Sequence, residues 1–517
     1  MVQIDLKNNA YYKWQKLSKG WWCGKGFLDN QPFSPALLEK ELLACHSKAA
    51  IIQFLKKING FFGFIWSFDD KTTLVVVDIA RTFPLFWKVD GERIILSDHL
   101  NKNTGEASLW LANSCFSHST FVPGHTTLLA GWNQLQAGEL LEIKSGICYI
   151  DNWFSHQRQL NINNTGYASY QKDFKDLIQQ QTQRLIRWAD GRRIVIPLSG
   201  GYDSRYILAV LLKEGYTNIK AFTYGMEDSE EVNTAQKIAQ QLSLDWIFVP
   251  YTAKLLDIFF TQEWDKYVEL GCNMASLPHD QDFFALSYLK KQGWLEENAI
   301  LCPGFCGDFQ AGSYLPHQYF KFPWRKTKAL QSYLLHKFVF QQNEQINKLW
   351  QYHLPKMDIQ NEEHLISELE NWSIKEYVSK YIVNGIRVYE FFEYDWYLPL
   401  WDTEFILFWQ GVPNEFRKNM ALYRDTLEQY LFEPLGLLYP EDTISKQPAF
   451  WKSVLSVTWK THLKKYKPGK SPENENGFTY LSKAIQKKMQ TNLPDSNITH
   501  NQVVGNWVDA FLKSEAK

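Results

Sequence analysis

Hydrophobic and polar positions follow two different patterns along this chain. Up to residue 155, short apolar or alternating runs at 61–66, 72–77, 85–89 and 93–96 predict strands. Turn sequences such as Asp69-Asp70-Lys71 separate them, and the main helical pattern is 37–55. The first part of the chain is therefore expected to be a β-rich α+β domain over 1–155.

The polar, aperiodic segment 156–167 predicts a linker, and the pattern changes after it. Predicted helices at 170–188, 205–214 and 230–242 then alternate with predicted strands at 194–197, 220–224 and 246–249. Such alternation indicates a parallel sheet with helices on both faces. Beyond about residue 320 the pattern is mainly helical. We therefore expect an α/β domain over 168–517 with a helical C-terminal part.

The segment that joins strand 194–197 to the next helix carries the clearest chemistry. It consists of Leu198, Ser199, Gly200, Gly201, Tyr202, Asp203 and Ser204. A strand that ends in glycines and continues as a helix brings unpaired N–H groups to a positive helix end, which suits a phosphate. The serine hydroxyls add donors. It is not a Walker A loop, because no Lys follows the last Gly. The alternative is a serine-rich turn without a ligand.

Composition narrows the function classes. The chain has 517 residues, 45% of them hydrophobic, and a net charge of −1, so it lacks the basic excess typical of nucleic-acid binding. It contains no run of 18 apolar residues, so no membrane span is expected. The seven cysteines are scattered, which is typical of reduced thiols in a cytoplasmic protein.

Several short motifs, in order, resemble those of the asparagine synthetase family. Residues 59–64, 78–86 and 96–98 resemble its NGxFAF, RDxxGxxPLYY and ASE segments, and residues 199–204 its SGGxDS ATP-pyrophosphatase loop. The resemblance implies a glutaminase-like domain of the N-terminal-nucleophile type over 1–155. It implies an ATP-pyrophosphatase synthetase domain over 168–517, with ATP and Mg²⁺ as cofactors.

The first departure from this family concerns the nucleophile. A class II glutaminase uses an N-terminal Cys, whereas residue 2 is Val here. Cys23 is followed by Gly24, but its use would require removal of all preceding residues and would leave too little chain for a glutamine pocket. Cys is more often a small buried hydrophobe than a catalyst. We therefore expect Cys23 in an interior strand of a degenerate glutaminase domain that no longer hydrolyses glutamine.

The resemblance also assigns the nucleotide and metal sites. The nucleotide-binding residues it implies are Leu198, Ser199, Gly200, Gly201, Asp203, Ser204, Tyr224, Gly225, Pro303 and Gly304. Asp203 and Asp308 each follow a predicted strand, so both can face one crevice, and by resemblance they hold Mg²⁺ with pyrophosphate. For Asp203, helix capping is a compatible alternative. Phe305 replaces an acid of the family's acceptor site, which argues against aspartate as substrate.

Four further residues are candidates for catalysis. The family places a Lys ahead of an xxLR helix to stabilise the adenylation transition state. Within 417–427 no Lys is in register, so Arg424 is the best candidate for this role. The alternative is a surface Arg. His279 and Asp282 are expected to bind the acceptor or to act as a base, or else to begin a solvated helix. Glu390 recurs with Asn384 and Arg387 at helical i, i+3, i+6 spacing, so these residues share one face and line the pocket or form a structural ion pair.

These expectations describe an ATP-dependent ligase that adenylates a small-molecule carboxylate and transfers ammonia or an amine to it. A uronic-acid sugar, a peptide or an amino-acid derivative are the acceptor classes considered. No nucleic acid and no membrane are expected as partners, and a homodimer is left open. The alternatives are asparagine synthetase proper, using free ammonia, and a non-catalytic scaffold derived from the family.

Overall fold

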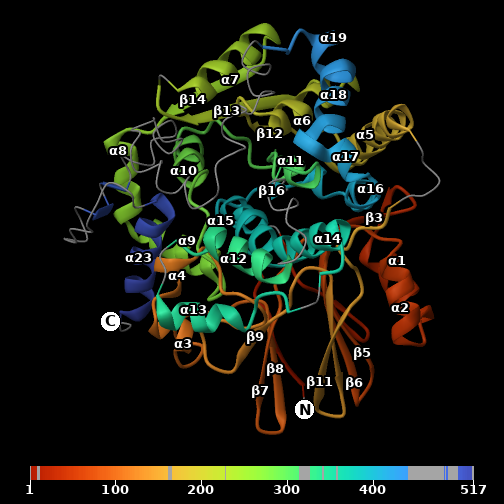
Figure 1. Cartoon of the computed structure of the whole chain (residues 1–517), viewed down its shortest axis with the longest axis vertical. Helices are drawn as coiled ribbons and strands as arrows, with labels where there is room; N and C mark the ends of the chain where they lie inside the picture. The colour runs from red at the N-terminus through yellow and green to blue at the C-terminus, as the bar shows by residue number, and fades with distance from the viewer. Residues whose placement is uncertain are drawn as a thin grey trace.

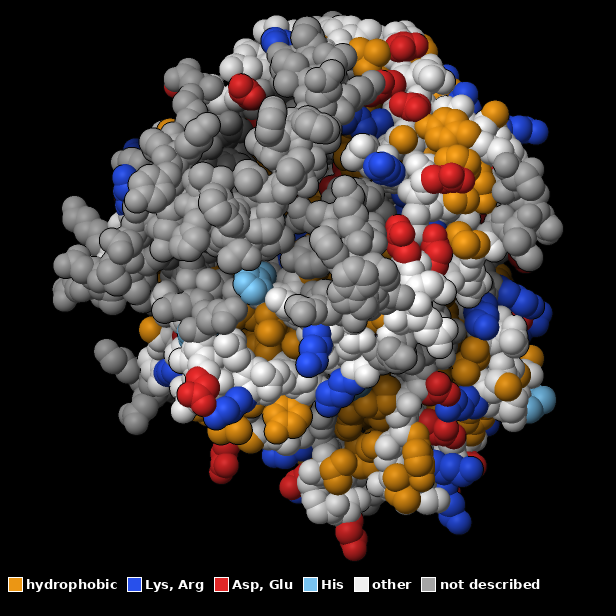
Figure 2. Space-filling model, in the orientation of Figure 1, with side chains coloured by type: hydrophobic (Ala, Val, Ile, Leu, Met, Phe, Trp, Pro, Cys, Tyr) orange, Lys and Arg blue, Asp and Glu red, His pale blue; other side chains and the backbone are white. Residues whose placement is uncertain are grey.

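The computed structural model describes residues 2–8, 12–160, 166–227, 229–313, 326–340, 343–356, 359–439, 482–483, 485–486 and 499–514. Two antiparallel-rich sheets form the N-terminal part, and a parallel sheet surrounded by helices forms the rest (Figure 1). In the described part of the chain, every helix is too short or too polar to span a bilayer. On the face shown in Figure 2, acidic and basic side chains are interspersed.

The larger N-terminal sheet has seven strands in the order β11-β10-β6-β5-β3-β2, with β4 paired to β3. Its strands are β2 (Gln15–Leu17), β3 (Gly20–Leu28), β4 (Gln31–Pro32), β5 (Asn59–Asp69), β6 (Thr72–Val77), β10 (Glu139–Lys144) and β11 (Ile147–Asn152). The second sheet has the order β1-β8-β7-β9, from β1 (Val2–Asp5), β7 (Phe86–Asp90), β8 (Arg93–Ser97) and β9 (Trp132–Gln134). The prediction of a β-rich first part is confirmed.

The helical pattern at 37–55 forms two helices instead of one. They are α1 (Pro35–Ala44) and α2 (Lys48–Leu55). The Ser47 side chain accepts a hydrogen bond from the Ala50 N–H and caps α2, just as Ser34 caps α1 through the Leu37 N–H. A second N-cap inside the pattern restarts the helix, because a serine in this position satisfies an otherwise unpaired donor. The short helices α3 (Leu109–Ala112) and α4 (Cys115–His118) complete this part.

The parallel sheet has five strands in the order β14-β13-β12-β15-β16. They are β12 (Ile194–Pro197), β13 (Ile219–Gly225), β14 (Asp245–Pro250), β15 (Ile300–Leu301) and β16 (Asp395–Trp396). Helices α5 (Tyr167–Ala189), α6 (Tyr202–Lys213) and α7 (Glu230–Gln241) connect or cover them. The strands and helices predicted between 170 and 249 are confirmed within a few residues. The edge strand β16 was not predicted, because two residues carry no periodic signal.

The rest of the described chain is helical, as predicted. Its elements are α8 (Ala253–Leu256), η1 (Asp257–Phe260), α9 (Gln262–Cys272), α10 (Phe283–Lys291), α11 (Gly307–Gln310), α12 (Lys326–Phe338), α13 (Glu344–Gln351), α14 (Glu362–Ser373), the π-helix η3 (Ile374–Ile382), η4 (Val383–Ile386), α15 (Arg387–Phe391), η5 (Pro399–Trp401), α16 (Thr403–Gly411), α17 (Asn414–Arg417), η6 (Lys418–Met420), α18 (Ala421–Leu427), the π-helix η7 (Glu428–Phe432), α19 (Glu433–Leu435) and α23 (His500–Lys513).

Buried polar contacts join the N-terminal part to the parallel sheet. The Lys25 ammonium on β3 lies 2.8 Å from Asp395 on β16, and both side chains are 1% exposed. Burial lowers the pKa of Lys25 to about 8. His156, at the start of the predicted linker, is buried and lies 2.9 Å from the Ile79 carbonyl. The predicted linker therefore begins with a residue that is packed against the fold, and 161–165 lie outside the described residues.

Candidate active site

The loop between β12 and α6 presents an open helix start. Gly201 is the N-cap of α6, and no side chain caps this helix. Asp203 therefore lies in the first turn and does not cap it. The Ser199 N–H donates to the Ser204 hydroxyl at 3.0 Å, and the Gly201 N–H donates to the Ser199 hydroxyl at 3.2 Å. The serines brace the loop, while the uncapped helix end remains suited to an anion.

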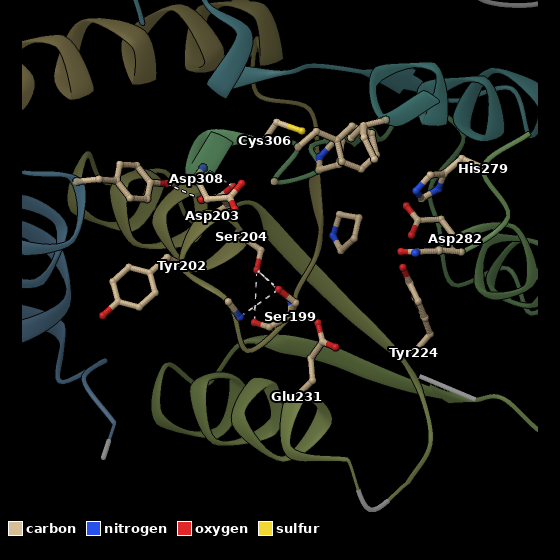
Figure 3. Close-up of a pocket in the computed structure, with 18 of the residues that line it drawn as sticks. Ser199, Tyr202, Asp203, Ser204, Tyr224, Glu231, His279, Asp282, Cys306 and Asp308 are labelled. Carbon is tan, nitrogen blue, oxygen red and sulfur yellow. Dashed lines mark hydrogen bonds between the residues drawn. The ribbon is translucent and has the colours of Figure 1, made fainter. Parts of the chain in front are cut away.

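A pair of carboxylates stands beside this loop (Figure 3). Asp203 Oδ2 accepts hydrogen bonds from the N–H groups of Gly307 and Asp308 at 2.7 and 3.1 Å. The Tyr423 hydroxyl donates to Asp203 Oδ1 at 2.7 Å. Burial, and then the charge of Asp308, raise the pKa of Asp203 to about 7; burial also raises the pKa of Asp308. A cation between the two would offset the repulsion by Asp308 that contributes to the raised pKa of Asp203.

The donor set fits magnesium. Mg²⁺ is commonly held by one or two carboxylates and completes its shell with phosphate oxygens and water. Asp203 and Asp308 supply two such carboxylates at the phosphate loop. Within the described residues, no group of three or more His, Cys, Asp or Glu side chains is arranged to hold a metal by itself. A bound nucleotide would therefore have to supply further ligands.

One cavity of about 610 Å³ contains the phosphate loop, the two carboxylates and the acceptor candidates. The expected nucleotide-binding residues that line it are Ser199, Gly201, Asp203, Ser204, Tyr224, Pro303 and Gly304. Asp308, His279, Asp282 and Arg424 line it as well. Leu198, Gly200 and Gly225 are not among the described lining residues. Leu198 instead donates its N–H to the Phe222 carbonyl, and Gly225 pairs with Pro250 at the end of the sheet.

Glu390 does not reach this cavity in the described structure. It is 3% exposed, lies 2.6 Å from Arg387 and accepts from the Trp396 indole at 2.9 Å. Arg387 in turn donates to the Thr82 carbonyl of the N-terminal part. Arg387 and Glu390 both lie in α15, three positions apart, so they share a helical face and can pair. The geometry favours the structural ion pair that the sequence left as the alternative.

The acceptor candidates lie together at the other end of the cavity (Figure 3). Asp282 is the N-cap of α10, yet its side chain makes no capping bond and instead accepts from the Tyr389 hydroxyl at 2.5 Å. His279 is 6% exposed, and burial lowers its pKa, which leaves the imidazole neutral near pH 7. The ring of Phe305 lies 6.1 Å from that of His279. A solvated helix start does not describe these residues.

Arg424 is a buried residue, not a surface one. Its side chain is 8% exposed and its guanidinium lies 5.0 Å from the centre of the Tyr202 ring. Met420, four residues earlier, also lines the cavity.

Sequence reasoning missed Lys337 on α12. Burial lowers the pKa of Lys337 to about 7, while the charge of Asp308 acts to raise it. No motif marked Lys337, since the helix packing alone brings it near Asp308.

Sequence reasoning also missed several other lining residues. Tyr202 and Tyr423 lie in segments that were singled out, next to Asp203 and Arg424, but aromatic residues there carried no chemical signal. Glu231, on α7, and Gln281 line the cavity too. The placement of Glu231 follows from the packing of α7 behind the phosphate loop, where its backbone lies 3.4 Å from a side-chain position at Gly200.

Comparison with known proteins agrees with this geometry. The family model described as asparagine synthase matches residues 173–431, which is half of the chain and includes every described residue that lines the cavity. No curated protein matches the chain. The family uses ATP with magnesium, and the match supports an ATP-dependent amide-forming ligase. The chain therefore belongs to the asparagine synthase family.

Proposed function

We propose that this protein adenylates a carboxylate with ATP, releases pyrophosphate, and transfers the acyl group to ammonia or an amine. The observation that carries the proposal is one cavity that holds the uncapped start of α6, the Asp203–Asp308 pair and a separate acceptor end. In the first step a substrate carboxylate oxygen forms a bond to the α-phosphorus, and the bond to the β-phosphate bridging oxygen breaks. In the second step the amine nitrogen displaces AMP and loses a proton.

The phosphate end of the cavity suits the first step. Backbone N–H groups at the start of α6 can donate to phosphate oxygens, and Arg424 can balance the charge that develops on the leaving pyrophosphate. Asp203 and Asp308 would hold Mg²⁺, which neutralises phosphate charge when bound. By resemblance to the family, the adenine would lie at the end of β13, where Tyr224 lines the cavity.

The acceptor end suits the second step. The attacking amine must lose a proton, and a neutral imidazole such as that of His279 can accept it. Phe305 places a ring where the family has an acid, which disfavours aspartate and favours a substrate with apolar surface at this point. A uronic-acid sugar, a peptide or an amino-acid derivative are the classes to test.

We also propose that the protein does not hydrolyse glutamine itself. Cys23 lies inside β3, where it pairs with Gly63 of β5, and is 2% exposed. Burial raises the pKa of its thiol well above the usual value, so the nucleophilic thiolate is disfavoured. Ammonia or an amine would then come from solution or from another protein.

The proposal is tested by pyrophosphate release with Mg-ATP across a panel of carboxylates and amines, for the wild type and Asp203→Ala. Release that requires both an acid and Asp203 supports adenylation and identifies the acid. Release only with aspartate and ammonia would make the protein an asparagine synthetase. Absence of both release and ATP binding would refute the proposal and favour a non-catalytic scaffold.

A further inference from the structure

The C-terminal helix α23 packs between the N-terminal part and the acceptor end of the cavity. Figure 1 shows α23 beside α4 and α9. A capping box fixes its first turn: the Thr499 side chain accepts from the Gln502 N–H, and the Gln502 side chain accepts from the Thr499 N–H. The start of this helix is therefore well defined, and its first residues can hold other side chains in place.

His500, the first residue of α23, links two distant segments. Its Nε2 lies 2.7 Å from Asp280 Oδ2, and its Nδ1 lies 3.0 Å from the Ser482 hydroxyl. His500, Asp280 and Ser482 are 5%, 2% and 8% exposed. A carboxylate accepts only, so the Nε2 carries the proton toward Asp280. This buried chain fixes Asp280, whose neighbours on both sides, His279 and Gln281, line the cavity.

The next residue of α23, Asn501, holds a second group near His279. The Tyr381 hydroxyl, on η3, donates to Asn501 Oδ1 at 3.0 Å. The Tyr381 ring lies 5.3 Å from the His279 ring. Two successive residues of α23 therefore hold both the backbone that carries His279 and an aromatic ring that packs on it.

Residues farther along α23 anchor it to the N-terminal part. A side chain at Gly505 would meet the Phe116 carbonyl at 1.9 Å, so the helix and α4 are in close contact. Asp509 accepts from the Ser117 N–H and hydroxyl, both at 2.7 Å. The segment that leads to the acceptor loop is held by the same part, since the Leu277 N–H donates to the Thr120 carbonyl at 2.8 Å.

We infer that His500 is a positioning residue, through which α23 and the N-terminal part hold the 278–282 segment in the geometry that binds the acyl acceptor. The inference rests on the proposed function for its consequence in activity. It assigns the glutaminase-like part a second role, as the frame of the acceptor end. Loss of a buried hydrogen bond to a carboxylate leaves that carboxylate partly unsatisfied, which loosens the segment.

The first test is hydrogen exchange of the full-length protein, because it needs no substrate. In His500→Ala the amides of 276–290 should exchange about tenfold faster, while those of 199–213 on the phosphate side stay unchanged. Asn501→Ala should show a smaller effect at 276–290, and it serves if His500→Ala does not fold. Asn506→Ala, whose side chain bonds only to the Gln502 carbonyl among the described contacts, is the matched control and should match the wild type.

The second test measures activity with the acid found in the pyrophosphate assay. In His500→Ala the KM for that acid should rise about tenfold while the KM for Mg-ATP stays within about twofold. His500→Gln should recover part of the loss, since its amide can donate to Asp280. Unchanged exchange and unchanged KM, or equal rises in both KM values, would overturn the inference. If the wild type releases no pyrophosphate with any acid, the proposed function fails, and the exchange result still decides the role of His500.

Discussion

Gly304 is the residue at which one added carbon should disturb the site most. It lies directly against the start of α6: an ideal Cβ there would be 2.7 Å from the Ser204 nitrogen and 3.0 Å from the Asp203 carbonyl carbon. Ordinary contact begins near 3.4 Å, so the backbones must separate by at least 0.7 Å (3.4 minus 2.7). Both atoms belong to backbone, and a flexible side chain cannot absorb the clash.

This separation should cost stability and, more strongly, activity. Overpacking of this kind costs about 1–3 kcal/mol. The shift displaces Asp203 and the N–H groups of the phosphate loop together, and a misplacement of about 1 Å can reduce a rate by about 100-fold. We therefore expect Gly304→Ala to lower acid-dependent pyrophosphate release by about 10- to 100-fold.

The matched control is Gly201→Ala, in the loop between β12 and α6. A Cβ at Gly201 would meet only the Ser199 hydroxyl, at 3.3 Å, and Gly201 has an extended backbone that alanine adopts readily. Release of pyrophosphate and affinity for Mg-ATP should be measured for both variants, with thermal unfolding to separate folding from function. Equal activity of the two alanine variants would refute the argument that close approach at Gly304 positions the site.

Three further predictions concern the metal pair, the thiol and the interface. Protons and Mg²⁺ compete for Asp203, whose pKa is about 7. The Mg²⁺ concentration that gives half-maximal activity should therefore rise about tenfold when the pH falls from 8 to 6. Equal values from Mg²⁺ titrations at the two pH values would contradict this. Because the Cys23 thiol is buried, Cys23→Ser should keep its ammonia-dependent activity within about twofold of the wild type, and glutamine should support no activity in either protein. If the wild type produced glutamate from glutamine and the variant did not, Cys23 would be a working glutaminase nucleophile. Lys25→Met should destabilise the protein by about 3 kcal/mol in urea unfolding, because Asp395 loses a buried partner; an unchanged midpoint would show that Arg192, 3.0 Å from Asp395, suffices.

The parallel sheet and its phosphate loop follow from local sequence. The run 194–197 is a strand because its β-branched residues are buried on both faces, and the predicted bounds equal those of β12. The glycines after it end the strand. The helix that follows, predicted to begin at residue 205, begins at Tyr202 in the structure. The approach of Asp203 to Asp308 was also predictable, since both follow neighbouring strands of a parallel sheet, whose carboxyl ends meet at one edge.

The acceptor end shows where sequence reasoning stops. His279 and Asp282 were singled out from the sequence, but their burial depends on rings from η3 and α15, far away in the chain. For Glu390 the helical spacing left two alternatives, the pocket or an ion pair, and only the packing of α15 shows that it pairs with Arg387. Neither the π-helix η3 nor the strand β16 has a local signal, because both form only when packed.

The sequence by itself determined most of the order of strands and helices and the phosphate loop, because each depends on residues a few positions apart. It also indicated the carboxylate pair and the family, because each carboxylate follows a strand that local sequence predicts and the motifs occur in a fixed order. Only the tertiary structure decided which side chains share the cavity, which cations lie near the pair, and how α23 reaches Asp280. These contacts join segments more than 100 residues apart, and their free energy comes from burial of surfaces that no local pattern records.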